Sequence, residues 1–160
     1  MASFKLTNRV EAPIDAVFDI FSDIPRADKM IDAIVRIEML TDGPVGVGTR
    51  WRETRMMFKR EATEEMEVTA FDRGRSYTIG CTSCGCEYES TWRFLAEGGA
   101  TQVEFEMGYR PVSFFAKAMS PLGRLMAPMM KKCFEKDFQA LKAVAESGDA
   151  PDAAQGRAIA

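Results

Sequence analysis

The 160-residue chain contains no histidine. Histidine is the usual general base near neutral pH, and it is an essential member of Ser/His/Asp triads and of HExxH zinc sites. These three kinds of catalysis are therefore excluded. Any acid–base chemistry would have to use carboxylate, Tyr, Lys, Arg or Cys side chains.

The sequence also lacks a long apolar run and a surplus of basic residues. No segment approaches the roughly 20 apolar residues that span a bilayer, and the first residues lack the apolar region of a signal peptide. The formal net charge is −3, so there is no basic face for nucleic acid. We therefore expect a cytoplasmic protein that does not bind nucleic acid and keeps its thiols reduced.

The pattern of apolar residues changes twice along the chain. A strand and two short helices come first, six strands with period-two alternation follow, and one long amphipathic helix comes last. This order is typical of an α+β fold. We expect a single domain over residues 1–146 and a disordered tail over 147–160, which is small and polar. The predicted elements are a strand at 3–12, helices at 12–21 and 22–31, strands between 33 and 109, and a helix at 129–146 after a stretch broken by Pro121, Gly123 and Pro128.

The alternation also predicts which strand residues face each other. A sheet covered on one side must place its apolar residues on that side. Closing one hairpin at the Gly-Gly pair places Trp92 opposite Phe105, with charged residues on the outer face. The same reasoning places Trp51 opposite Met66 in an earlier hairpin.

Five segments resemble the SRPBCC superfamily of START-like, helix-grip proteins, and within it the polyketide cyclase/dehydrase-like group. The segments are EAPIDAVFDIFSDI (11–24), GPVGVGTRWRET (43–54), EVTAFDRGRSYTI (67–79), YESTWRFL (88–95) and DFQALKAVAE (137–146). The resemblance implies a bent, seven-stranded antiparallel sheet wrapped around the C-terminal helix. It also implies an apolar cavity for lipids, polyketides or other hydrophobic molecules, which some relatives cyclise or dehydrate and many only carry.

The segment CTSCGC at 81–86 holds three of the four cysteines. One hairpin register places Cys81 opposite Cys86, within reach of a disulfide. A second register forms a two-residue turn from Cys84 and Gly85 and places Cys81 opposite Tyr88. Unmodified cysteines at the cavity rim are the favoured interpretation.

No motif in the sequence indicates a metal or a cofactor. A zinc site at the CTSCGC hairpin needs a fourth ligand, and Cys133 lies well along the last helix. The glycine-rich GPVGVG segment joins two strands, whereas a phosphate-binding loop should join a strand to a helix. We therefore expect no metal and no cofactor.

Two opposed carboxylates are the sharpest candidates for catalysis. If Trp51 faces Met66, Glu53 faces Glu64, and the proximity of two carboxylates raises one pKa toward that of a general acid. Tyr88 is a third candidate for acid–base chemistry. The alternative interpretation is a solvated hairpin end in which Arg55 or Lys59 neutralises the pair.

The leading functional hypothesis is binding of a small hydrophobic molecule, such as a lipid, a polyketide or an aromatic compound. The alternative is a cyclase or dehydratase that uses Glu53, Glu64 or Tyr88. A methionine-rich, basic segment at 112–130 also suggests transient contact with a membrane. The candidate ligand-binding residues are Trp51, Met66, Val68, Tyr77, Ile79, Tyr88, Trp92, Phe105, Met107, Met130, Cys133 and Phe134.

Overall fold

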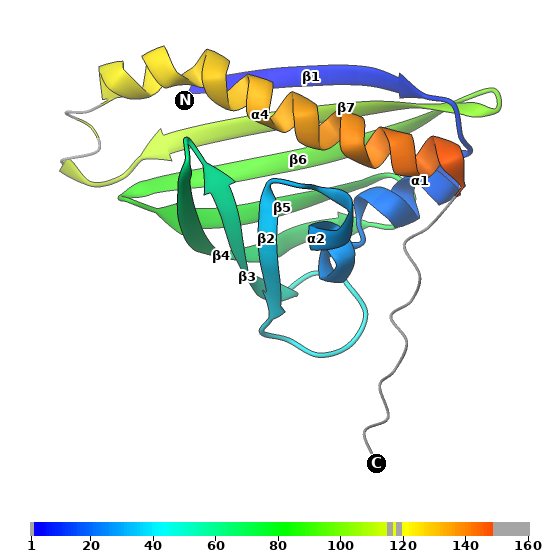
Figure 1. Ribbon diagram of the computed structural model, residues 1–160, viewed down its shortest axis with the longest axis horizontal. Helices are drawn as coiled ribbons and strands as arrows, with labels where there is room; N and C mark the ends of the chain where they lie inside the picture. The colour runs from blue at the N-terminus through cyan, green and yellow to red at the C-terminus, as the bar shows by residue number, and fades with distance from the viewer. Residues whose placement is uncertain (1, 115–116, 118–119, 149–160) are drawn as a thin grey trace.

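A computed structural model describes residues 2–114, 117 and 120–148, with only the backbone considered for residues 2 and 120–126. It shows one seven-stranded antiparallel sheet in the order β1-β7-β6-β5-β4-β3-β2, with α4 lying along one face (Figure 1). The predicted α+β helix-grip fold is thus confirmed. The elements are β1 (Ala2–Val10), α1 (Ile14–Phe21), the 3-10 helix η1 (Ile24–Arg26), α2 (Ala27–Met30), β2 (Ile34–Met39), β3 (Arg50–Met57), β4 (Arg60–Asp72), β5 (Ser76–Ser83), β6 (Cys86–Glu97), β7 (Ala100–Pro111) and α4 (Ser120–Ser147).

The strand registers follow from alternating apolar residues and short turns. Trp51 faces Met66 across β3 and β4, and Trp92 faces Phe105 across β6 and β7, as predicted. All of these strands put apolar side chains on the same face of the sheet. A slip of one residue in the pairing would turn the apolar side chains of that strand to solvent, so burial of this face fixes the register. The sheet curls, so β2, β3 and β4 run across the direction of β6 and β7 (Figure 1).

The CTSCGC hairpin adopts the second of the two predicted registers. Cys81 faces Tyr88, and Ser83 faces Cys86. Cys84 and Gly85 have φ angles of 50° and 74°, as in a type I′ turn, whose twist matches that of the flanking strands. The register that placed Cys81 opposite Cys86 is therefore wrong, and all four cysteines are free thiols.

The C-terminal helix is longer than the sequence pattern predicts. α4 begins at Ser120, so the predicted start at Met129 is wrong. Pro121 lies in the first turn, where no backbone hydrogen bond is lost, and the helix passes through Pro128 despite the missing N–H at that residue. The predicted disordered tail falls mostly on residues 149–160, which lie outside the described residues.

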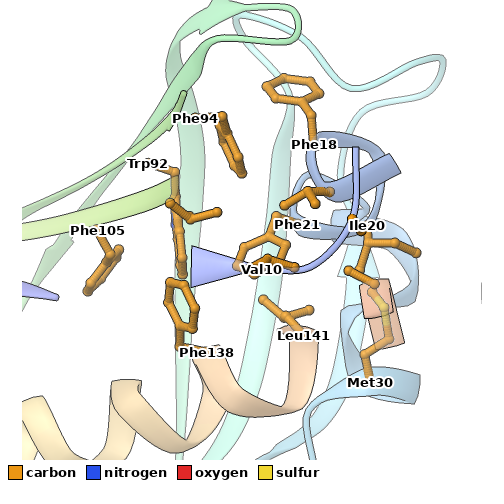
Figure 2. Close-up of a cluster of buried hydrophobic side chains, with 14 of the residues drawn as sticks. Val10, Phe18, Ile20, Phe21, Met30, Trp92, Phe94, Phe105, Phe138 and Leu141 are labelled. Atoms are coloured by element: carbon orange, nitrogen blue, oxygen red, sulfur yellow. The ribbon is translucent and has the colours of Figure 1, made fainter. Parts of the chain in front are cut away.

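An aromatic core joins α1 and the second half of α4 to the sheet (Figure 2). The ring of Phe21 lies 5.4 Å from that of Trp92 and 5.3 Å from that of Phe138, measured between centroids. Phe138 is completely buried. This packing closes one end of the space between the sheet and α4.

Candidate functional site

A cavity of about 510 Å³ lies between the sheet and α4. It exists because a single long helix cannot cover the inner face of seven strands. Its volume falls within the range of about 300 to 1,000 Å³ that is usual for small-molecule sites. Its wall is mainly apolar and aromatic. It is completed by α1, η1, α2 and the residue after α2, which contribute Ile20, Phe21, Ile24, Ala27, Met30 and Ile31.

Ten of the twelve predicted ligand-binding residues line this cavity. Val68 does not, because it is fully buried against Ile24 of η1 and Trp51. Cys133 does not line it either, although it is half-buried on α4. Whether the ten lining residues contact a ligand stays a prediction. They are Trp51, Met66, Tyr77, Ile79, Tyr88, Trp92, Phe105, Met107, Met130 and Phe134.

Three charged side chains form a buried cluster in the cavity wall. Glu53 and Arg55 project from the same face of β3, and Arg55 Nε lies 2.9 Å from Glu53 Oε1. The other arm of Arg55 donates a hydrogen bond of 2.7 Å to Asp137 Oδ2 on α4. The guanidinium also lies 5.4 Å from the ring centroid of Phe134. Arg55 therefore ties the sheet to the helix, and we call Glu53, Arg55 and Asp137 the charge cluster.

Burial and the neighbouring charges act in opposite directions on the pKa values of Glu53 and Arg55. Burial raises the pKa of Glu53, and the nearby Arg55 lowers that pKa only in part. Burial acts to lower the pKa of Arg55, but Glu53 and Asp137 together outweigh it and raise that pKa. Arg55 is therefore a permanent cation in the cavity wall, and the Glu53 carboxyl takes up a proton at higher pH than an ordinary glutamate does.

The predicted carboxylate pair is present in the register, but its surroundings differ from a simple pair. Glu53 and Glu64 face each other across β3 and β4. Glu53 pairs with Arg55, as the alternative interpretation predicted. Glu53 is buried, however, and does not lie at a solvated hairpin end. Glu64 accepts a hydrogen bond of 3.5 Å from the Cys81 thiol. Lys59 forms no ion pair with any described residue.

Two weak acids lie on the cavity wall beside Glu64. Burial, followed by the charge of Glu64, raises the pKa of Cys81 to about 12. Burial, followed by the neighbouring Cys86, raises the pKa of Tyr88 to about 12. Near neutral pH both side chains are therefore uncharged hydrogen-bond donors, and Cys81 is a poor nucleophile.

Arg55 and Tyr109 are polar wall residues outside the predicted ligand-binding and catalytic sets, although the strand pattern offered a clue to both. Arg55 lies four positions after Trp51 on β3, and Tyr109 lies two positions after Met107 on β7. An even spacing along a strand places both members of each pair on the same face. The residues of the short helices had no comparable clue, because helical spacing of apolar residues indicates a core and not a cavity.

The segment predicted to touch a membrane is described only in part. Phe114 is 90% exposed and Met129 is 49% exposed, while the side chains of residues 115, 116 and 118–126 lie outside the described residues. In the described part of the chain, no helix is both long and apolar enough to cross a bilayer. Nor do three or more metal-ligating side chains gather at one point among these residues.

The fold and the cavity together define a class of protein: helix-grip α+β domains that enclose an apolar space between a bent sheet and a C-terminal helix. The chain belongs to the polyketide cyclase/dehydrase and lipid transport family, which matches residues 1–146. This confirms the resemblance found in the sequence segments.

Solved structures from distant relatives share this fold. The protein TTHA0849 of Thermus thermophilus is 18% identical, with a TM-score of 0.75 over 93% of this chain and 100% of that one. The Zhui aromatase/cyclase of Streptomyces sp. R1128 is 17% identical, with a TM-score of 0.72 over 91% and 98%. Norcoclaurine synthase of Thalictrum flavum is 16% identical, with a TM-score of 0.70 over 93% and 96%. A search of the curated proteins finds no match.

Proposed function

We propose that this protein binds one small, largely apolar molecule in the cavity between its sheet and α4. The observation that carries the proposal is the cavity itself, about 510 Å³ of space with an aromatic and aliphatic wall. Burial of apolar ligand surface supplies the affinity, at about 25 cal/mol for each Å² removed from water. The few polar wall groups orient the ligand.

The charge cluster restricts the kinds of ligand that fit. Glu53 and Asp137 already neutralise Arg55, so the cluster does not offer a free cation to an anionic ligand. A neutral molecule with hydroxyl or carbonyl groups avoids the cost of bringing another charge into a buried site. Polyketides and hydroxylated aromatic compounds have this chemistry.

Native mass spectrometry of the purified protein tests the proposal. We expect a retained apolar molecule, or uptake of one from a mixture of aromatic and aliphatic probes. Ser90→Phe places a ring in the cavity, because Ser90 lines the wall, and it should weaken uptake at least about tenfold. Glu89→Phe places the same ring on the exposed face of the same strand and serves as the control. Uptake by neither wild type nor control would overturn the proposal.

A second candidate is catalysis of a cyclisation or dehydration on the bound molecule. It is favoured by one observation, the raised pKa of the buried Glu53 in the cavity wall. The aromatase/cyclase among the structural relatives makes this chemistry a reasonable comparison. Glu53→Gln should then abolish turnover of a polyketide-like substrate and leave its binding nearly intact, whereas Glu65→Gln on the outer face should change neither. Unchanged turnover in Glu53→Gln would exclude the candidate.

A further inference from the structure

Four buried polar atoms of cavity-lining residues have no hydrogen-bond partner among the described residues. Two of them, Oδ2 of Asp23 and Nε of Arg55, belong to ion pairs, with Arg26 and Glu53. The other two, Nε1 of Trp51 and the hydroxyl of Tyr109, belong to no ion pair. Both atoms are buried, and Trp51 is only 1% exposed. A buried polar group without a partner costs about 1 to 3 kcal/mol, so proteins rarely keep one without a reason. Both residues line the same cavity.

The two atoms lie at opposite ends of one row of side chains across the sheet. Trp51 on β3 faces Met66 on β4, which faces Cys81 on β5. Cys81 faces Tyr88 on β6, and Tyr88 faces Tyr109 on β7. Directly opposed residues point to the same side of an antiparallel sheet, so all five side chains lie on the cavity face. Figure 1 shows these five strands side by side in this order.

The length of the row follows from the spacing of strands. Four steps of about 4.8 Å give about 19 Å along the sheet. The straight distance between the ends is shorter, because the sheet is bent (Figure 1). A molecule that reaches from one end to the other must therefore be elongated.

The two ends offer different hydrogen bonds. At the Trp51 end, the indole N–H lies near the Glu53 carboxyl and lowers its pKa, although the two make no aligned hydrogen bond. An N–H donor and a carboxylate acceptor side by side suit a hydroxyl, which can accept from one and donate to the other. At the Tyr109 end, the phenol hydroxyl can donate or accept, so it suits a hydroxyl or a carbonyl.

The side chains in the middle of the row are polarizable and uncharged. Met66 contributes a thioether, and Cys81 stays a protonated thiol whose hydrogen is directed to Glu64. The ring of Tyr88 lies 6.3 Å from that of Tyr109. These groups favour an apolar or aromatic stretch of ligand.

We propose that the cavity selects an elongated, uncharged molecule with an apolar body and an oxygen function at each end, bound between Trp51 with Glu53 and Tyr109. This inference rests on the proposed function and adds the class of ligand. It assigns Trp51 and Tyr109 the role of recognising the two polar ends. The affinity comes from the apolar body, and the two ends decide which molecules of that length are preferred.

Three matched probes test the inference on the whole protein: dodecanediol with a hydroxyl at each end, dodecanol and dodecane. Binding is measured by isothermal titration calorimetry. We expect the diol to bind about three- to tenfold more tightly than dodecanol, after correction for its two equivalent orientations, since one further buried hydrogen bond is gained. The advantage should be smaller for octanediol, whose two hydroxyls are four methylene groups closer together.

Two variants locate the effect. Tyr109→Phe keeps the ring and should remove the preference for the diol, and Trp51→Phe should do the same. Because Trp51 is a core residue, its variant is used only if its circular dichroism matches the wild type, and Tyr109→Phe together with the wild-type probe series carries the test otherwise.

The outcomes separate this inference from the proposed function. Equal binding of dodecanediol and dodecanol, or an unchanged preference in Tyr109→Phe, would overturn the two-ended ligand and leave cavity binding intact. Binding of none of these probes, together with no retained molecule in native mass spectrometry, would overturn both.

Discussion

Replacing Arg55 by Met should reveal how strongly the charge cluster depends on its cation. The change removes the ion pair with Glu53 and the hydrogen bond to Asp137, and leaves two carboxylates that are only 8% and 7% exposed. Removing one partner of a buried ion pair typically costs about 3 to 5 kcal/mol, because the other charge remains without compensation. We expect a loss of that size in the free energy of unfolding at neutral pH.

The loss should depend on pH in a defined direction. Burial raises the pKa of Glu53 in the folded protein above its ordinary value of 4.5, and removing Arg55 raises it further, since Arg55 lowers it in the wild type. Over the interval between the unfolded and the folded pKa, the folded state binds more protons, so stability falls as pH rises. The penalty is complete above the folded pKa and should shrink as the pH falls through it toward 4.5.

Urea denaturation followed by tryptophan fluorescence measures the effect, because Trp51 and Trp92 are both buried. For a slope of about 2 to 3 kcal/mol per molar urea, the midpoint should fall by roughly 1 to 2.5 M. Arg52→Met is the matched control: it lies on the same strand, points outward, is 41% exposed in its side chain, and pairs with Glu38. An exposed pair contributes less than about 1 kcal/mol. Equal midpoints for the two variants at neutral pH, or a loss that grows on acidification, would refute the reasoning.

Three further predictions concern the core and the cysteines. Phe138→Ala should cost about 3 to 5 kcal/mol in thermal or urea unfolding, because the ring is fully buried between Phe21 and Trp92, whereas Phe114→Ala, at 90% exposure, should change stability by less than about 0.5 kcal/mol. Tyr77→Phe should lose about 1 to 2 kcal/mol, since it removes the buried hydrogen bond of 2.5 Å that the hydroxyl donates to the Phe21 carbonyl; an unchanged unfolding midpoint would contradict this. Iodoacetamide near pH 8, read by peptide mass spectrometry, should modify the exposed Cys84 well before Cys81, whose pKa is raised to about 12; equal rates would show that the Cys81 thiol is not protected as described.

Local patterns in the sequence were enough to predict most of the sheet. The pairing of Trp92 with Phe105, and of Trp51 with Met66, depends on period-two alternation and on turns of a few residues. The segments that resemble helix-grip proteins extended this to the full fold. Local patterns were weaker where two turns were compatible with one sequence, as at CTSCGC, and where a proline lies inside a helix, as at Pro128.

The candidate site was predictable only as far as strand alternation reaches. Side chains that alternate with outward-facing charges, such as Tyr88 and Met107, were expected on the cavity wall and lie there. Val68 shares that alternation, but Ile24 of the short helix η1 covers it. Alternation predicts which face of a strand is inward, and it contains no information about which inward residues another element will cover.

The sequence by itself determined the class of fold, the strand faces and the exclusion of histidine chemistry, because these follow from residue types and from spacings of two to four positions. Only the tertiary structure decided that Arg55 would meet Asp137, 82 residues further along the chain, and that Trp51 and Tyr109 would end one row across five strands. The physical reason is that both arrangements depend on how far the sheet bends and where α4 lies against it. Those quantities are set by the packing of the whole core, and no short stretch of sequence contains them.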